Sequence, residues 1–325
     1  MSPPTANTPV ATGLMRLASL PSEEDALAAI KTSIDNGSTY LNAAEFYGPP
    51  TYGSLYFLAR YLERHPKDAG KITLNVKGAL NTSTFMPDAA PDKTRQSIEN
   101  CLRLLEGRVK IHQFAPARVD PEHDILDTLG VVDEYVQAGK IGAIGLSEAS
   151  ETTLRRVASK YKVATLEIEF SLFRTDPLSN GLLAACAELG VTVLAYSPLG
   201  KGLLGGQFKK VEDIPENDMR RHFPQFSADN LAKNLELVHA VEELAQKKGC
   251  TAGQIAIGWI LDVAKRPGMP TIHPLQGSSN PSRIKENLAV VDLSAEEVAQ
   301  IDEILKTFVG AGSRYPEHLM TVVEK

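Results

Sequence analysis

Residues 71–78 read KITLNVKG, and the alternation in this stretch is the pattern from which we predict the fold. Thr73, Asn75 and Lys77 alternate with apolar side chains, so a β-strand places the two sets on opposite faces. The apolar face is expected to pack on helices, which leaves Lys77 pointing inward near the carboxyl end of the strand. An inward lysine is costly to bury unless a charge or a cofactor meets it. This stretch therefore predicts both a sheet covered by helices and a functional residue inside it.

Eight β-like stretches recur along the chain, and helical patterns separate them. The strands are predicted at 11–17, 39–45, 71–78, 109–117, 141–147, 164–170, 191–197 and 270–276. The helices are predicted at 22–37, 91–107, 123–140, 150–161, 177–190, 231–249, 251–265, 282–291 and 294–308. This alternation predicts an α/β chain whose parallel strands close into a (β/α)8 TIM barrel. An open doubly wound sheet is the alternative, but no GxGxxG motif follows the first strand.

No sequence feature marks a domain boundary, so we interpret residues 1–325 as one barrel domain. A segment at about 205–230, rich in Pro, Asp, Arg and Phe, is predicted to form a long loop after the seventh strand. Loops of that length within a compact domain are more often functional than not. The tail at about 309–325 has no strong periodicity, so it either covers the mouth of the barrel or frays.

Composition and charge narrow the class of protein. A formal net charge of -6 argues against nucleic acid or an anionic membrane as the main partner. The 3 cysteines lie far apart without a CxxC or Cys/His cluster, so no metal site is predicted. No apolar stretch approaches the roughly 20 residues of a membrane helix. The N-terminal stretch lacks the pattern of a signal peptide, and a reducing, cytoplasmic compartment is expected.

A second candidate residue follows the strand at 39–45. Tyr40 and Asn42 share one face of that strand, and Tyr47 lies just beyond its end. Alone, a tyrosine at a strand end is more often a packing residue than a catalytic one. Beside an inward Lys77, its pKa is expected to fall from the ordinary value of about 10 toward neutrality, which suits a proton donor.

Residues 276–283, QGSSNPSR, suit an anion. They place small hydroxyls and free backbone N–H groups at the N-terminus of a predicted helix, which attracts negative charge. Arg283 lies about one turn into that helix, where its guanidinium group can bind a phosphate. The alternative is an ordinary Ser or Asn cap followed by a solvated arginine.

Six segments together resemble the aldo-keto reductase family, and they occur in the family's order. They are YLNAAEFYG (40–48), LNVKG (74–78), GKIGAIGLSEAS (139–150), ATLEIEFSL (164–172), VLAYSPLGKGLLGG (193–206) and LQGSSNPSRIKENL (275–288). The resemblance spans nearly the whole chain. It implies a single barrel that reduces aldehydes and ketones with NADPH, usually without a metal. It also implies that Tyr47 is the general acid and that Lys77 lowers its pKa.

The resemblance also assigns a cofactor site. Ser147 matches the residue that holds the nicotinamide carboxamide, and Tyr196 matches the residue that stacks on the nicotinamide or the adjacent cofactor surface. The loop over the pyrophosphate corresponds to Ser197, Leu199, Gly202 and Leu203. The site for the adenosine and the 2′-phosphate corresponds to Gly277, Ser278, Ser279, Arg283, Glu286 and Asn287. Gly13, in the first strand, joins the expected cofactor-binding residues.

Two departures from the family pattern concern the catalytic centre. The aspartate that usually pairs with the lysine is Asn42, which can hydrogen-bond to Lys77 but cannot neutralise it. We therefore expect Lys77 to exert a strong, uncompensated field on Tyr47. The usual active-site histidine is replaced by Ala117, which removes one group that orients the substrate.

Two other departures concern the nicotinamide. Glu148 and Glu167 stand where the family has the Asn and Gln that hold the carboxamide. Glu167 can still accept a hydrogen bond from the carboxamide N–H, whereas an ionised Glu148 cannot donate to the carboxamide oxygen.

Together these departures resemble one branch of the family, the fungal pyridoxal reductases. The segments NAAEFYG (42–48), ARVDP (117–121), GLSE (145–148) and LEIEFSLF (166–173) carry that resemblance, which implies reduction of pyridoxal to pyridoxine. Ala117 leaves space for a flat aromatic aldehyde. Phe46 either contacts that ring or points into the helix layer. Arg118 either donates to an oxygen or phosphate of the substrate or forms a salt bridge at the strand end.

Other functions stay open at this point. A general aromatic aldehyde reductase of secondary metabolism fits the same residues. A non-catalytic NADPH-binding regulatory subunit, like the potassium-channel β subunits, would share the fold, but we see no inactivating N-terminal extension. Asn42 and Ala117 would also fit an enzyme that has lost its activity. The presence of Tyr47 and Lys77 argues against that alternative. Neither the exact carbonyl substrate nor the oligomeric state is predicted.

Overall fold

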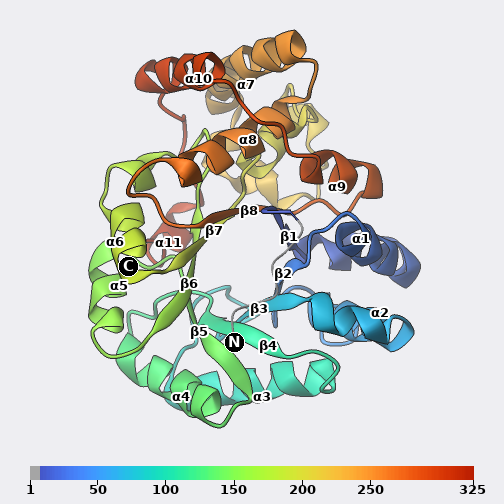
Figure 1. The fold of residues 1–325 in the computed structure, drawn as a ribbon, viewed down its shortest axis with the longest axis vertical. Coiled ribbons are helices and arrows are strands. Elements are labelled where there is room, and N and C mark those ends of the chain that lie inside the picture. The colour runs from blue at the N-terminus through green and yellow to red at the C-terminus, as the bar shows by residue number, and fades with distance from the viewer. Residues whose placement is uncertain (1–7) are drawn as a thin grey trace.

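Eight parallel strands close into a barrel in the computed structural model, which describes residues 8–325 (Figure 1). Each strand pairs with the next one in the sequence, and β8 closes the ring by pairing with β1. The strands are β1 Ala11–Gly13, β2 Tyr40–Ala44, β3 Thr73–Gly78, β4 Ile111–Pro116, β5 Ile141–Ser147, β6 Val163–Glu169, β7 Thr192–Tyr196 and β8 Ile272–Gln276. The predicted (β/α)8 TIM barrel is confirmed. The prediction about the N-terminal stretch falls partly on residues 1–7, which lie outside the described residues.

Helices surround the barrel and account for most of the predicted helical patterns. They are α1 Glu23–Asp35, α2 Ser54–Arg64, α3 Pro91–Leu105, α4 Ile125–Gln137, α5 Glu151–Ala158, α6 Leu182–Leu189, α7 Ala228–Lys248, α8 Ala252–Lys265, α9 Pro281–Leu288, α10 Ala295–Thr307 and α11 Glu317–Met320. The sequence patterns do not predict α2, whose several aromatic residues have only moderate helix propensity. The first strand is shorter than predicted because Met15–Ser19 forms a 3-10 turn.

The alternation predicted for residues 71–78 is present in β3. Leu74 and Val76 join the large apolar core, whereas Thr73, Asn75 and Lys77 are buried polar side chains. The Nδ2 atom of Asn75 donates a hydrogen bond to Oγ1 of Thr165 on β6, at 3.3 Å, so these side chains meet inside the barrel. The barrel interior is therefore largely polar, and the main apolar core lies between the strands and the helices.

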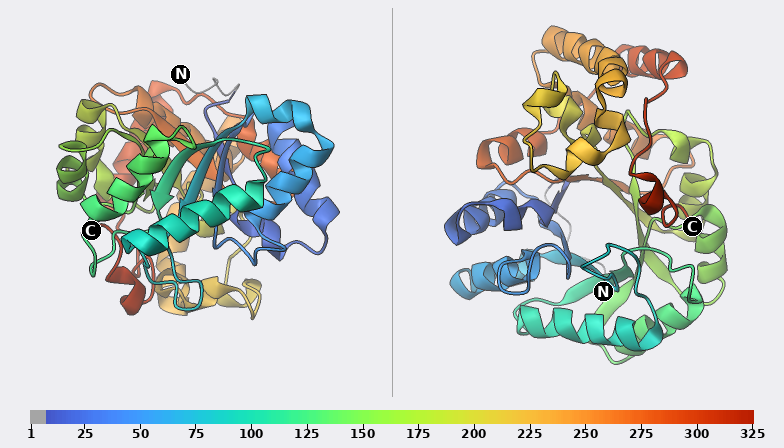
Figure 2. Two further views of the ribbon diagram at one scale, coloured as in Figure 1. Left: turned by 90° about the horizontal axis from the view of Figure 1, so that it is seen from below. Right: turned by 180° about the vertical axis from the view of Figure 1, so that it is seen from behind.

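Two irregular segments lie at the carboxyl end of the barrel. The chain between β7 and α7 forms four short 3-10 turns: η4 Gly200–Gly205, η5 Val211–Asp213, η6 Met219–His222 and η7 Pro224–Phe226. The tail after α10 contains the short helix α11 and continues to Lys325. Figure 2 shows these turns, in yellow, and α11, in dark red, at the same end of the barrel. The mouth of the barrel is thus framed by segments without long helices.

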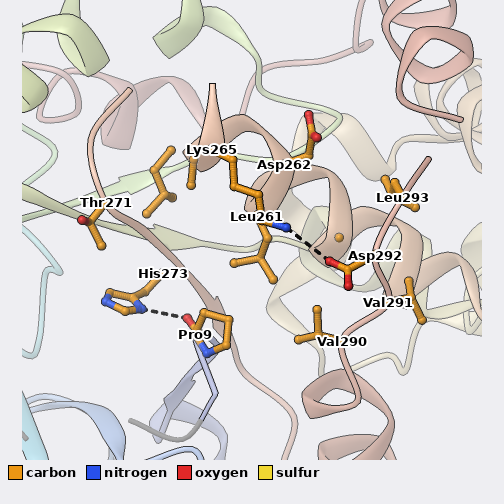
Figure 3. A pocket seen from close by; sticks show the side chains of 13 residues that line it. Pro9, Leu261, Asp262, Lys265, Thr271, His273, Val290, Val291, Asp292 and Leu293 are labelled. Carbon is orange, nitrogen blue, oxygen red and sulfur yellow. Dashed lines mark hydrogen bonds and ion pairs between the residues drawn. The ribbon is translucent and has the colours of Figure 1, made fainter. Parts of the chain in front are cut away.

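A pocket of about 340 Å³ lies at the opposite end of the barrel (Figure 3). Thr271 and His273 line it at the start of β8, and Nδ1 of His273 is hydrogen-bonded to the carbonyl of Pro9 at 2.7 Å.

Within residues 8–325, no group of three or more His, Cys, Asp or Glu side chains is arranged to hold a metal ion. In the same part of the chain no helix is long and apolar enough to cross a membrane.

Candidate active site

Tyr47 lies in a tight turn between β2 and α2. Its backbone N–H donates to the carbonyl of Ala44 at 3.2 Å, and its own carbonyl accepts from the N–H of Ser54 at 2.8 Å. Gly48 follows with φ +89, and a Cβ atom there would lie 2.5 Å from the Cβ of Ala18, so only glycine fits this turn. The half-buried Tyr47 ring packs edge to face on Phe46, with 5.1 Å between the ring centroids. Phe46 therefore borders the candidate proton donor.

Lys77 lies beneath Tyr47, with its Nζ atom 5.2 Å from the centre of the Tyr47 ring. Nζ donates to Oδ1 of Asn42 at 2.8 Å and to both carboxylate oxygens of Glu167, at 2.6 and 2.7 Å. The expectation that the charge of Lys77 is uncompensated is therefore wrong. Glu167 reaches across the barrel from β6 and supplies the carboxylate that position 42 lacks. The Lys77 cluster, as we call Lys77, Glu167 and Asn42, is almost fully buried.

The pKa of Tyr47 reflects opposing influences. Burial raises it, and nearby Glu167 raises it further, while the cations Lys77 and Arg118 lower it. The net pKa lies above the ordinary value, so the predicted fall of the Tyr47 pKa toward neutrality is wrong. The cations nevertheless keep the pKa below the value that burial alone would produce. A neutral hydroxyl at physiological pH is the form that a proton donor needs.

Arg118 lies just beyond β4, where the chain leaves the buried Ala117. Its Nη1 atom donates to the Ala117 carbonyl at 2.6 Å, and no carboxylate of residues 8–325 pairs with its guanidinium. The salt bridge that seemed the alternative for this residue is therefore absent from the described part of the chain. The remaining N–H groups of the Arg118 guanidinium stay available to a ligand. Its positive charge also helps to lower the pKa of Tyr47.

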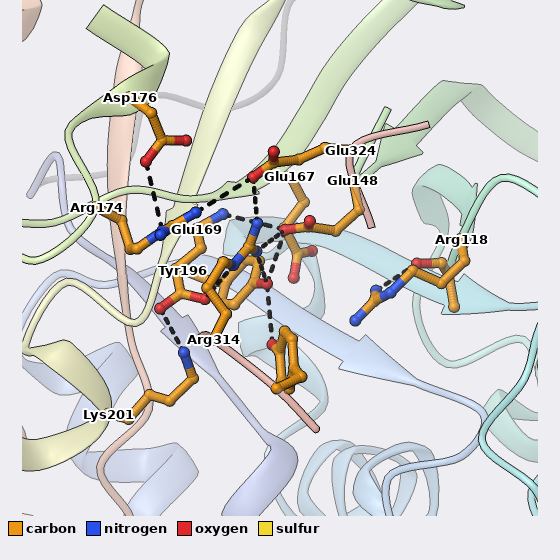
Figure 4. Close-up of polar contacts among 12 residues, drawn as sticks. Arg118, Glu148, Glu167, Glu169, Arg174, Asp176, Tyr196, Lys201, Arg314 and Glu324 are labelled. Carbon is orange, nitrogen blue, oxygen red and sulfur yellow. Dashed lines mark hydrogen bonds and ion pairs between the residues drawn. The ribbon is translucent and has the colours of Figure 1, made fainter. Parts of the chain in front are cut away.

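A second buried cation comes from the tail. Arg314 is 2% exposed and donates from Nε to Glu169 at 2.9 Å and from Nη2 to Glu148 at 2.6 Å (Figure 4). Nη2 also donates to the hydroxyl of Tyr196 at 2.7 Å, and Nη1 pairs with Glu324. Burial alone would raise the pKa of Glu148, but Arg314 outweighs it with the help of other donors and holds that pKa below its usual value. We call Arg314, Glu148, Glu169 and Tyr196 the Arg314 cluster.

Sequence reasoning missed both Arg314 and Glu169 as members of the site. Glu169 shares the inward face of β6 with Glu167, so strand alternation alone could have identified it. Its carboxylate also pairs with Lys201 from η4. No comparable signal exists for Arg314, because the tail has no periodicity that would predict where its side chains point.

Two buried polar atoms at the end of β5 have no partner. Ser147 Oγ and Glu148 Oε2 make no hydrogen bond within residues 8–325. A primary carboxamide offers an acceptor for the Ser147 hydroxyl and N–H donors for the Glu148 carboxylate, so these atoms fit the end of a nicotinamide. Glu148 has φ 55 and Ser197, after β7, has φ 54. Such left-handed conformations are strained for residues other than glycine, and they cluster at functional sites.

The loop after β7 lies beside α9, as a pyrophosphate site would require. Nη1 of Arg283 donates to the Gly205 carbonyl at 2.9 Å, which joins α9 to η4. The expected free N–H groups at the start of α9 are absent, because Oδ1 of Asn280 accepts from the N–H of Ser282 at 2.9 Å and from that of Arg283 at 3.3 Å. Within η4, Gly202 adopts φ +105, and a Cβ atom there would lie 3.0 Å from Nη1 of Arg220.

The other predicted cofactor residues lie around the same end of the barrel. Gly13 pairs in register with Asn42, at the carboxyl end of β1. Asn287 points at Gln276, whose Oε1 accepts from Asn287 Nδ2 at 3.4 Å and from the Ser278 N–H at 2.8 Å. Leu199 precedes η4 and Leu203 lies within it. Gly277 and Ser279, between β8 and α9, and Glu286, within α9, are at least partly exposed.

Comparisons with known proteins agree with this geometry. Residues 9–306 match the model of the aldo/keto reductase family. A protein of Schizosaccharomyces pombe named as probable pyridoxal reductase 2 is 35% identical over 96% of this chain and 95% of its own length. A Saccharomyces cerevisiae protein named for the same activity is 33% identical over 85% of this chain and 84% of its own.

A solved structure supports the same conclusion. The glycerol dehydrogenase of Gluconobacter oxydans superimposes with a TM-score of 0.81 and 25% identity, over 94% of this chain and 93% of its own. The chain therefore belongs to the aldo/keto reductase family and is an oxidoreductase that acts on carbonyl and alcohol groups.

Proposed function

We propose that this chain reduces an aldehyde to a primary alcohol with NADPH, and that Tyr47 donates the proton. The observation that carries the proposal is the position of Tyr47 at the mouth of the barrel above a buried Lys77. Active sites of such barrels form at the carboxyl ends of the strands, which is where both residues lie. Lys77 has no structural need to be inside the barrel, so its burial is best explained by chemistry.

Each residue of the site has its own role in the proposed reaction. A bound nicotinamide supplies the hydride, and Ser147 with Glu148 would hold its carboxamide. The Tyr47 hydroxyl donates its proton to the carbonyl oxygen as that oxygen gains negative charge. Lys77 stabilises the phenolate that remains on Tyr47, and Asn42 holds the ammonium group in place at 2.8 Å. A positioned acid of this kind typically accelerates a reaction by about 10²–10⁴-fold.

The preference for NADPH over NADH rests on Arg283. The guanidinium donates to the Gly205 carbonyl, and α9, which carries Arg283, follows the connection from β8 that contains Ser278 and Ser279. A 2′-phosphate in this region would receive a charge-assisted hydrogen bond from Arg283, which NADH cannot accept. Arg283 is also only partly buried, so its side chain is accessible to a ligand.

The substrate is proposed to be an aromatic aldehyde, with pyridoxal as the first choice. Ala117 is fully buried just after β4, and its side chain is smaller than the histidine that the family usually has at this position. Arg118 brings free N–H groups toward the same region, and Phe46 offers an aromatic edge beside Tyr47. Pyridoxal has a flat pyridine ring, and its ring nitrogen and phenolic oxygen can accept hydrogen bonds, so it suits such a site. The names of two relatives support the same choice.

A panel of aldehydes at saturating NADPH tests this substrate. We expect kcat/KM for pyridoxal to exceed that for benzaldehyde, a nitrobenzaldehyde and a sugar aldehyde, measured by NADPH absorbance. Arg118→Ala should lower the value for pyridoxal about tenfold, as expected for one lost hydrogen bond to a charged group, and should affect benzaldehyde much less. If pyridoxal ranks well below the simple aromatic aldehydes, it is not the preferred substrate, although carbonyl reduction itself stands.

A further inference from the structure

We propose that Glu167 is the positioning residue that fixes the charge of Lys77, in a role that this chain has moved from β2 to β6. The inference rests on the proposed function, because it concerns how Lys77 supports Tyr47. A carboxylate at position 42 of the neighbouring strand β2 would lie beside Lys77, because Oδ1 of Asn42 is already 2.8 Å from the Nζ atom. This chain has an amide there, and the carboxylate comes from across the barrel instead.

The contacts of Lys77 support this assignment. Glu167 is the one carboxylate of residues 8–325 that lies within salt-bridge distance of the Nζ atom, and both of its oxygens take part. The two side chains are 3% and 7% exposed, so water cannot replace the pairing. A buried ammonium group without an anion loses its charge easily, because burial disfavours the charged form. In this protein Glu167 and Tyr47 outweigh burial and keep the pKa of Lys77 above its usual value.

The side-chain amide of Asn42 fits this arrangement because it can both accept and donate hydrogen bonds. Its Oδ1 accepts from Lys77, while its Nδ2 donates to Glu167 Oε2 at 2.7 Å and to Asn75 Oδ1 at 3.1 Å. An aspartate at position 42 has no N–H to donate, so it would place one carboxylate against another. Two carboxylates that share a buried site repel each other. Restoring the usual aspartate alone should therefore harm the site rather than improve it.

Other titratable groups face this cluster and set the direction of any pH effect. Tyr40 from β2, Tyr47 after β2 and Arg118 after β4 all interact electrostatically with Glu167. Burial, with a contribution from Glu167, keeps the pKa of Tyr40 far above neutrality, so it stays neutral. Arg118 stays charged at every accessible pH. The changes that a variant causes near neutral and alkaline pH therefore arise from Lys77 and Tyr47.

The direction of the effect follows from the sign of each interaction. Glu167 raises the pKa of Tyr47 and that of Lys77, so Glu167→Gln lowers both. Activity should then begin to fall at a lower alkaline pH than in the wild type. Asn42→Asp adds a carboxylate, which raises the pKa of Tyr47 and makes it a weaker acid. The double variant Asn42→Asp/Glu167→Gln keeps one carboxylate beside Lys77 and should resemble the wild type.

The experiment measures kcat against pH for the two single variants and the double variant, with NADPH affinity measured separately by fluorescence quenching. Each single variant should lose about tenfold in kcat, and their alkaline limbs should move in opposite directions by about one pH unit, the lower end of the effect of a neighbouring charge. The double variant should recover most of the loss. Its recovery is the essential result, because a merely structural role of Glu167 predicts that the two losses add.

Three outcomes distinguish the explanations. If Glu167→Gln changes only NADPH affinity and leaves the pH profile of kcat in place, Glu167 serves the cofactor and the inference is wrong. If Glu167→Gln fails to fold while the double variant folds and is active, the need for one carboxylate beside Lys77 is supported. If Tyr47→Phe is itself fully active, the proposed function fails, and that result is independent of the double variant.

Discussion

Lys77 and Arg314 are buried cations that meet glutamates at the same end of the barrel, and they come from different parts of the chain. Lys77 belongs to β3 and meets Glu167 of β6, so the barrel itself fixes both partners. Arg314 belongs to the tail and meets Glu148 and Glu169, which follow or end β5 and β6. The first pair lies beneath Tyr47, whereas the second joins the last segment of the chain to the mouth of the barrel.

This difference separates a cluster that supports the reaction from a cluster that anchors the tail of the chain. The geometry of the Lys77 cluster cannot change without distorting the barrel, so it is suited to hold a proton donor in a fixed environment. The Arg314 cluster can form only when the tail is in place, and Tyr315 adds a contact of 3.0 Å between its hydroxyl and that of Tyr196. Variants of either cation should lower stability, because each leaves a buried carboxylate without its cation. We expect variants of Lys77 to act in addition on the proton-transfer step, and variants of Arg314 in addition on the cofactor site.

Arg314→Ala should have the largest effect on stability. It leaves Glu148 buried without its closest cation, and removing one partner of a buried pair costs about 3–5 kcal/mol. The free energy of unfolding, measured by urea denaturation near neutral pH, should fall by that amount. The KM for NADPH should rise more than kcat falls, because Arg314 contacts Glu148 and Tyr196 rather than Tyr47.

Arg155→Ala is the matched control, because Arg155 also pairs with two glutamates but lies on the surface. It should leave the urea midpoint essentially unchanged, since exposed ion pairs contribute little. The contribution of Glu148 also has a pH window. Its pKa is held below the ordinary value, so the stabilisation is present above about pH 4.3 and is lost as the pH falls through the folded-state pKa. Equal losses in Arg314→Ala and Arg155→Ala would contradict the account.

Lys77→Met should have the largest effect on the reaction among the cation variants. The methionine is close in length but carries no charge, so the phenolate of Tyr47 loses its stabilising neighbour. We expect kcat to fall by about 10²-fold, which corresponds to about 2.7 kcal/mol. Single-turnover measurements with NADPH should show this loss in the reduction step. A loss confined to KM would mean that Lys77 serves binding rather than chemistry.

Arg283→Ala should have a smaller effect, and one that depends on the cofactor. Arg283 is only partly buried and has no carboxylate partner within residues 8–325, in contrast to Lys77 and Arg314. Its loss should cost about 1.5–3 kcal/mol in kcat/KM with NADPH and little with NADH, as expected for one charge-assisted hydrogen bond. Equal use of NADPH and NADH by the wild type would remove the reason for this assignment.

The contrast between the two clusters also explains what the sequence could predict. Period-two alternation places Lys77 and Asn42 on the inward faces of their strands, and the structure confirms both, since the two side chains meet inside the barrel. Glu167 was expected from the family resemblance to face the nicotinamide. Alternation cannot say which inward side chains meet across the barrel, because that depends on the lengths of the side chains and the closure of the sheet. The pairing of Lys77 with Glu167 was therefore not predicted.

The tail was beyond sequence reasoning for a different reason. Arg314 lies in a segment without periodicity, and its burial depends on three carboxylates supplied by Glu148, Glu169 and Glu324. For residues 276–283 the sequence left an Asn cap and an anion site as alternatives, and the structure shows the cap, because Oδ1 of Asn280 accepts from the N–H groups of Ser282 and Arg283. Long-range contacts of irregular segments are fixed by tertiary packing, which local patterns do not report.

The central claim is that Tyr47 donates the proton, and Tyr47→Phe tests it most directly. The variant keeps the ring that packs on Phe46 and removes only the hydroxyl, so folding and NADPH affinity should stay close to those of the wild type. We predict that single-turnover reduction of an aromatic aldehyde slows by about 10²-fold or more. Near-normal turnover in Tyr47→Phe, with the same NADPH affinity, would contradict the account.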